Sequence, residues 1–131
     1  MENPQLSYTG IDHFVLTVDD IDRSCTFYES IGGEIRTFSR RRKAVHFGDQ
    51  KINLHRSESS DITPVAAAPQ AGSGDFCLLV NETIDRVIDI LEKEGIPLVL
   101  GPVDRTGANG SIQSVYVRDP DGNLVELSTY L

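Results

Sequence analysis

The sequence predicts an α+β fold of two βαβββ modules, whose strands form a curled mixed sheet around a cleft. A strand, a helix and three further strands are expected twice within 131 residues. Residues 13–18 superpose on residues 75–80 with their apolar side chains in phase, which indicates a duplicated module. The segment DPDGN at 119–123 also predicts a tight hairpin, because proline fixes φ and glycine accepts a positive φ.

The first half begins with a strand at 11–18, where apolar and polar side chains alternate. Asp19 or Asp20 can cap the helix that follows, and the pair Gly32-Gly33 can end it. Three strands are expected next, at residues 34–39, 43–47 and 51–55. Residues 57–74 are small, polar and proline-containing, which indicates a connecting loop.

The second half repeats this order. It begins with a strand at 75–80 and a helix that Asn81 or Thr83 can cap and that Gly95 ends. Three strands are expected at 97–100, 112–118 and 123–128, with a glycine-rich loop at 101–110. The expected organisation is a tail at 1–10 and a single domain at 11–131, composed of module 1 (11–56), a linker (57–74) and module 2 (75–131).

The amino-acid composition limits the kinds of molecule and the cellular compartment that suit this protein. Twenty acidic against twelve basic side chains give a net charge of −8, which disfavours nucleic acid and anionic membranes as partners. No apolar stretch approaches the roughly 20 residues that span a bilayer, and the first ten residues lack the pattern of a signal peptide. Two cysteines, Cys25 and Cys77, form no disulfide framework. We therefore expect a cytoplasmic protein.

A set of potential metal ligands falls on the polar side of the predicted strands, which we expect to line one shared cleft where His13 and Glu126 come close enough to bind one ion. Glu126 lies between Val125 and Leu127, so alternation directs it away from the apolar face. Superposing the modules places His13 over Asp75 and Asn53 over Glu126, and His55 shares the face of Asn53. Imidazole nitrogen with carboxylate oxygen suits a borderline divalent ion, and open positions would let a substrate bind it.

Each of these residues also has a structural interpretation. His13 can be a hydrogen-bonded strand residue, Glu126 can pair with Arg118, and Asp75 can simply terminate the loop. His46 is expected to be a core or surface residue, and Cys77 a small residue of the cleft wall. The basic run at 40–43 is either a solvated strand end or an anion site.

Four strings carry a resemblance to a known superfamily: IDHFVLTV, GDQKINLH, GPVDRTGANG and SVYVRDPDGNLVELS. They resemble the vicinal oxygen chelate superfamily, which includes glyoxalase I, bleomycin-resistance proteins, fosfomycin-resistance enzymes and extradiol dioxygenases. QKINLH and RTGA are similar to the branch of glyoxalase domain-containing protein 5. The resemblance covers about residues 10–130. It implies the paired-module fold and, as in many relatives, a homodimer.

The resemblance also implies a site. The superfamily's first-strand His matches His13 and its last-strand Glu matches Glu126, whereas Asp75 and Asn53 stand where glyoxalase I has His and Glu. The third metal ligand is then His55 or Asp75, and the cofactor a divalent ion such as Ni, Zn, Mn, Fe, Co or Mg. Glu126 is the expected catalytic residue.

The implied function is that of a metal-dependent lyase, isomerase or dioxygenase. The metal would act as a Lewis acid that chelates adjacent oxygens of a small substrate. Arg105, Tyr116 and Arg118 are candidates to hold an anionic substrate, because guanidinium binds carboxylate or phosphate through two hydrogen bonds. The alternative is a metal-free protein of the bleomycin-resistance type, which binds and sequesters a small molecule.

Overall fold

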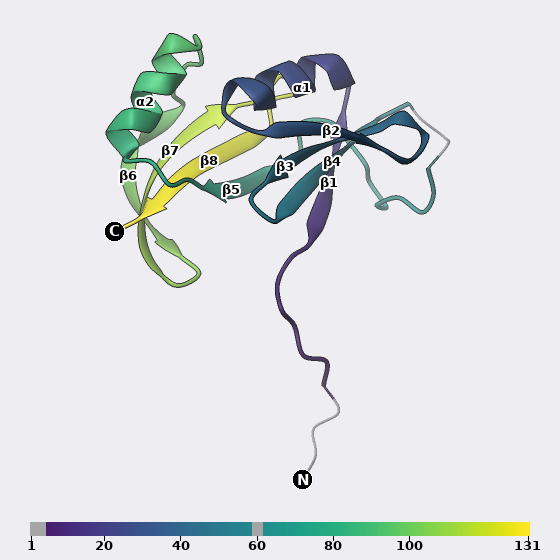
Figure 1. The fold of residues 1–131 in the computed structure, drawn as a ribbon, viewed down its shortest axis with the longest axis horizontal. Helices are drawn as coiled ribbons and strands as arrows, with labels where there is room; N and C mark the ends of the chain where they lie inside the picture. Colours follow the sequence, from purple (N-terminus) through teal and green to yellow (C-terminus); the bar gives the residue numbers. More distant parts are fainter. Residues whose placement is uncertain (1–4, 59–61) are drawn as a thin grey trace.

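The computed structural model describes residues 5–58 and 62–131, and its architecture is the predicted α+β arrangement. Two four-stranded mixed sheets are each accompanied by one helix. In Figure 1 the second sheet lies to the left and the first to the right, with both helices along the upper side. The two sheets are separate and do not close on each other within the chain.

The first sheet contains β1 (His13–Val18), β2 (Glu34–Phe38), β3 (Arg42–Phe47) and β4 (Gln50–Arg56) in the order β1-β4-β3-β2. Strand β1 is parallel to β4, and the other pairs are antiparallel. Helix α1 (Ile21–Ser30) begins at Asp20, whose side chain accepts a hydrogen bond from the Arg23 amide. A short 3₁₀ turn, η1 (Ser39–Arg41), joins β2 to β3.

The second sheet repeats this order as β5-β8-β7-β6. Its strands are β5 (Asp75–Leu79), β6 (Leu100–Gly107), β7 (Gly110–Arg118) and β8 (Leu124–Tyr130). Helix α2 (Ile84–Lys93) begins at Thr83, whose hydroxyl accepts from the Arg86 amide. The Asp-Pro-Asp-Gly segment forms the turn between β7 and β8, where Gly122 has a φ of +89°.

The prediction for residues 97–110 was wrong in one respect. The expected strand at 97–100 is almost entirely irregular, whereas the expected glycine-rich loop forms most of strand β6. Pro102 is tolerated because β6 is an edge strand, where a missing N–H breaks no ladder. Gly101 is required, because a Cβ there would lie 2.7 Å from the Ser114 carbonyl oxygen. The pairing of β6 with β7 shifts register between Leu100 and Val103.

The two sheets have equivalent registers. Val15 pairs with Asn53 across β1 and β4, and Cys77 pairs with Glu126 across β5 and β8. Asn53 and Glu126 therefore occupy the same place in their respective sheets, as the superposition of the two halves predicts.

One hydrophobic core serves both halves. It includes Leu16 and Val18 of β1, Tyr28 of α1, and residues of β7, β8 and α2. Phe14 and Phe76 join β1 to β5, with ring centroids 5.1 Å apart at 63°. The Tyr28 hydroxyl donates across the halves to Asp119 Oδ2 at 2.6 Å. No helix within the described residues has the length and apolar character needed to cross a membrane.

Candidate metal and substrate site

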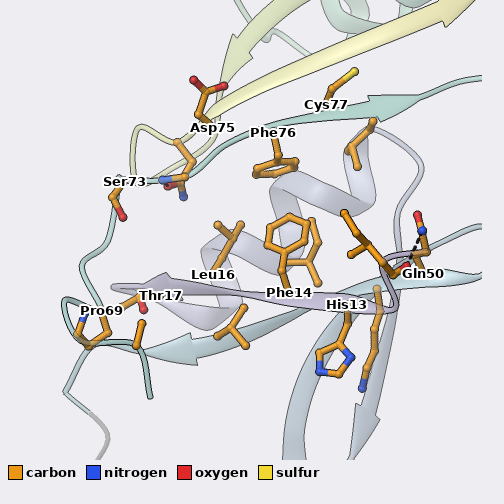
Figure 2. Close-up of a pocket in the computed structure, with 18 of the residues that line it drawn as sticks. His13, Phe14, Leu16, Thr17, Gln50, Pro69, Ser73, Asp75, Phe76 and Cys77 are labelled. Atoms are coloured by element: carbon orange, nitrogen blue, oxygen red, sulfur yellow. Dashed lines mark hydrogen bonds between the residues drawn. The ribbon is translucent and has the colours of Figure 1, made fainter. Parts of the chain in front are cut away.

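The polar faces of the two sheets point in opposite directions. Figure 2 shows Phe14 and Phe76 facing each other, with His13 directed to one side and Asp75 and Cys77 to the other. Because the core fills the space between the apolar faces, each sheet presents its polar face outward. Two half-sites result, which we call face A (on β1, β4, β3 and β2) and face B (on β5, β8, β7 and β6).

Face A carries the imidazoles. His13 Nδ1 lies 2.7 Å from Asp12 Oδ1, and a carboxylate acceptor at Nδ1 favours the tautomer that leaves Nε2 free to bind a ligand. The parallel pairing of β1 with β4 places Thr17 beside His55 and Val15 beside Asn53. His55 and Asn53 are both buried, with 6% and 5% of their surface exposed.

Two polar atoms of face A are unpaired. His55 Nε2 and Asn53 Oδ1 are buried and lack a hydrogen-bond partner among the residues that the structure describes. A buried polar group without a partner is costly, so such atoms are commonly completed by a ligand, an ion or another chain. Residues of the following segment, including Ile62, Val65 and Pro69, line a hollow of about 230 Å³ beside His55.

Face B carries the carboxylate Glu126. The Ser114 hydroxyl donates to Glu126 Oε2 at 2.6 Å, and the Ser128 hydroxyl reaches the same oxygen at 3.2 Å. Both hydrogen bonds go to one oxygen, so the carboxylate is oriented while Oε1 has no hydrogen-bond partner among the described residues. Glu126 lines a hollow of about 380 Å³ together with Cys77, Leu79, Arg105 and Tyr130.

Cys77 is the neighbour of Glu126 across β5 and β8. Its Sγ donates to Ser128 Oγ at 3.2 Å. Although the side chain is partly exposed, partial desolvation raises the pKa of the Cys77 thiol; the Ser128 hydrogen bond lowers it and the Glu126 charge raises it. The thiol is therefore protonated at neutral pH, as suits a residue of the site wall.

The predicted substrate-binding residues also lie on face B. Arg105 Nε donates to the Tyr116 hydroxyl at 3.0 Å, and Tyr116 pairs with Glu126 across β7 and β8. Arg118 is near the end of the same strand and donates to the Gly122 carbonyl at 3.2 Å. Among the described residues Arg118 forms no ion pair with Glu126, so the interpretation of Glu126 as a cross-strand partner of Arg118 is not supported.

The predicted ligands do not converge within one chain, contrary to the expectation that His13 and Glu126 share one cleft there. Across residues 5–58 and 62–131 there is no group of three His, Cys, Asp or Glu side chains close enough to hold a metal ion. His13 and His55 belong to face A, whereas Asp75 and Glu126 belong to face B. Asp75 is exposed at the start of β5, directly after the loop. His46 is on β3, where it pairs with Lys51 of β4, so strand β4 lies between His46 and the β1 residue His13.

Sequence reasoning missed three supporting residues. Ser128 lies two positions beyond Glu126 on the same strand, so alternation alone could have identified it. Asp12 precedes His13 directly. Ser114 could not have been found from local pattern, because its contact with Glu126 depends on the pairing of β7 with β8.

Comparison with known proteins supplies the family. Residues 10–127 match the model of the Glyoxalase/Bleomycin resistance protein/Dioxygenase superfamily. The chain is 47% identical over 131 residues to virulence protein STM3117 of Salmonella typhimurium, covering 99% of this chain and 90% of that protein. It is 47% identical over 126 residues to the glyoxalase domain-containing protein RDO1 of Mycosarcoma maydis, covering 96% and 71% of the two chains.

Solved structures agree with this assignment. The crystal structure of lactoylglutathione lyase from Agrobacterium tumefaciens gives a TM-score of 0.71 at 27% identity, covering 94% of this chain and 95% of that one. The family match extends over residues 10–127, which include every strand and helix of both sheets except the last three residues of β8. The chain therefore belongs to the Glyoxalase/Bleomycin resistance protein/Dioxygenase superfamily.

Proposed function

We propose that the protein is a metal-dependent enzyme acting on a small oxygen-bearing molecule, and that two copies of the chain complete its site. Face A of one copy would supply His13 and face B of the other Glu126, and the third ligand would be His55 from face A or Asp75 from face B. The observation that carries this proposal is His55 Nε2, a buried imidazole nitrogen that lacks a partner among the described residues.

The donor set fits a divalent ion. Imidazole nitrogen and carboxylate oxygen are preferred by ions such as Zn, Ni, Mn, Fe and Co, and carboxylate also suits Mg. Both principal ligands are already oriented by neighbours: Asp12 holds His13 through Nδ1, and Ser114 holds Glu126 through Oε2. Such outer hydrogen bonds are typical of residues that bind metals. A metal held there would supply Lewis acidity toward substrate oxygens.

The chain's own residues would then bind and orient the substrate. Arg105 is fixed by hydrogen bonds from Nε to the Tyr116 hydroxyl and from Nη1 to the Asp104 carbonyl oxygen, and Nη2 would serve an anionic group in the hollow of face B. Glu126 has one oxygen free and is the candidate to move a proton at the substrate carbon or oxygen.

Exposed apolar side chains beside the two half-sites support a homodimer, in which a second copy of the chain completes each site. Val15 on face A and Leu79 on face B are large apolar residues at 49% and 60% exposure, each beside the polar residues of its half-site. Scattered exposed apolar residues are ordinary, but here they border both incomplete half-sites. In a two-fold dimer, face A of each copy would cover face B of the other, so Val15 and Leu79 of both copies would be buried.

Elemental analysis of untagged protein tests the metal. Wild type should contain up to one divalent ion per chain, and Glu126→Ala and His13→Ala should each lower metal affinity by about ten- to a hundredfold or more. His46→Ala is the matched control, because β4 separates His46 from His13, and it should bind metal like wild type. Equal metal content in all four proteins would refute the proposal.

A second candidate function is metal-free sequestration of a small molecule. The observation in its favour is a half-open cavity of about 610 Å³ beside β1 and β5, whose lining includes Phe14, Leu16 and Phe76 together with polar residues such as His13, Lys51 and Asp75. Apolar walls of this size suit a compact organic ligand. Isothermal titration of chelator-treated protein that still binds such a ligand tightly, in wild type and Glu126→Ala alike, would favour this function.

A further inference from the structure

Two cations of face A surround one aromatic ring. Lys51 Nζ lies 4.1 Å from the ring centroid of Phe38, and Arg42 Cζ lies 4.7 Å from the same centroid. The contacts span three strands, since Phe38 is on β2, Arg42 on β3 and Lys51 on β4. Both cations contact the same ring, and a negative group that reached both would relieve their mutual repulsion.

Neither cation has a carboxylate partner among the residues that the structure describes. The ion pairs found there join His13 to Asp12, Arg36 to Glu34, and Arg56 to Glu58. Glu34, the nearest acidic residue of the sheet face, is therefore already engaged by Arg36. In addition, Arg42 Nε is a buried donor with no hydrogen-bond partner within the described chain.

The local charge contrasts with that of the whole chain. The protein carries a net charge of −8, yet face A gathers Lys51, Arg42 and Arg36 against two carboxylates, Glu34 on β2 and Asp12 just before β1. Arg40 and Arg41 follow at the edge in the turn η1, both with positive φ. Such a concentration of positive charge on an acidic protein attracts small anions to this face.

The cationic pair lies beside the predicted metal ligands. Lys51 pairs with His13 across β4 and β1. Continuing the pairing of Lys43 with Leu54 by one residue places Arg42 opposite His55. A group held by Lys51 and Arg42 is therefore one strand away from both imidazoles.

We propose that Lys51 and Arg42, positioned by Phe38, form an oxyanion-binding subsite that receives a carboxylate or phosphoryl group. Its assignment to the substrate rests on the proposed function, which it deepens: the substrate carries a charged group on face A, in addition to the one that Arg105 would hold on face B, and its reacting oxygens lie at the imidazoles. Guanidinium supplies two parallel N–H donors and ammonium a point charge, a pairing that suits such groups. Oxyanion binding itself requires no metal.

Titration of metal-free protein tests this subsite. Untagged, ¹⁵N-labelled protein in chelator is titrated with inorganic phosphate and, separately, with acetate at constant ionic strength, and amide shifts of β2, β3 and β4 are followed by NMR. Wild type should show saturable shifts around Phe38. Lys51→Gln should weaken binding by about tenfold, the loss of one charged hydrogen bond. Tighter phosphate binding identifies a phosphoryl group, and tighter acetate binding a carboxylate.

Two control variants make the result specific. Lys93→Gln removes the same charge from exposed α2 and should bind the anion like wild type. Lys51→Arg keeps the charge and should retain binding, which separates loss of the site from loss of the fold. Absence of saturable shifts near Phe38, or equal weakening by Lys51→Gln and Lys93→Gln, overturns the subsite. Because this titration uses metal-free protein, a negative result would not contradict the proposed metal site. Conversely, a failure to bind metal in the elemental analysis would not contradict the oxyanion subsite.

Discussion

At the scale of single residues, the most consequential contacts are the hydrogen bonds that orient the Glu126 carboxylate. Ser114 is fully buried and donates to Glu126 Oε2 at 2.6 Å, whereas Ser128 lies at 3.2 Å from the same atom. Short hydrogen bonds to a carboxylate are the stronger ones, so Ser114 dominates the orientation of Glu126.

Ser114→Ala should therefore lower divalent-metal affinity by about ten- to a hundredfold, because the carboxylate loses its principal orienting bond. Ser128→Ala should have a smaller effect. Competition with a chromogenic chelator measures both affinities. Ser111→Ala, on the exposed start of β7, is the control that should leave affinity unchanged. Equal affinity in Ser114→Ala and Ser111→Ala would contradict this role.

Tyr28 links stability to pH. Burial raises the pKa of the Tyr28 hydroxyl, and its hydrogen bond to Asp119 and the charge of Asp119 act in the same direction. The unfolded chain loses this proton near pH 10, whereas the folded chain retains it at higher pH. The folded state thus binds more protons above pH 10, and stability falls as pH rises.

Urea unfolding at pH 8 to 11 should show this dependence. The free energy of unfolding should fall above pH 10 by up to about 1.4 kcal/mol per pH unit on account of Tyr28. Tyr28→Phe should be less stable at pH 8 by about 1.5–3 kcal/mol, because Asp119 loses a buried donor. Its stability should also decline less between pH 10 and 11. Parallel curves for the two proteins would contradict the assignment.

At the scale of elements, local pattern predicts most of the fold. Alternation identifies the strands, and the caps at Asp20 and Thr83 and the turn at Gly122 are each specified by a few adjacent residues. Strand β6 escaped prediction because its glycine and proline are loop signals in sequence. Whether such residues can form a strand depends on the neighbouring strand, and here Gly101 permits the close approach of β7.

Gly101→Ala should test this role of β6. Gly101 has a φ of +120°, and an added Cβ would meet the Ser114 carbonyl oxygen at 2.7 Å. Gly122→Ala is the matched control, because Gly122 also has a positive φ but no atom within 4 Å of an added Cβ. Thermal and urea unfolding should show that Gly101→Ala costs about 1–3 kcal/mol more than Gly122→Ala. Equal losses would mean that the contact with β7 is unimportant.

At the scale of the whole molecule, the sequence predicts which residues share a face of each sheet but not how the two faces are directed. Alternation places His13, Asn53 and His55 together, and Cys77, Glu126 and Asp75 together. The relative direction of the sheets depends on the packing of Phe14 against Phe76 and on the core between them. Such contacts join residues about sixty positions apart, and no local period encodes them.

Oligomeric state should follow from these exposed faces. Light scattering at micromolar concentration should give twice the chain mass of 14.4 kDa. Leu79→Glu should shift the protein toward monomer and lower metal content together, because it places a charge beside Glu126 on face B. Leu131→Glu is the control, since this exposed residue follows Tyr130 and lies beyond the end of β8. A monomeric wild type that binds metal fully would contradict a site shared between copies.

The outward direction of the two polar faces has a genetic consequence. In a two-fold dimer every site would take face A from one chain and face B from the other, so the two sites exchange contributions. Chains carrying His13→Ala and chains carrying Glu126→Ala would each be inactive alone. In a mixed dimer, however, both defects fall in one site and the other site is intact. Unfolding and refolding the two variants together in equal amounts should therefore restore about a quarter of all sites, so two null alleles would rescue each other.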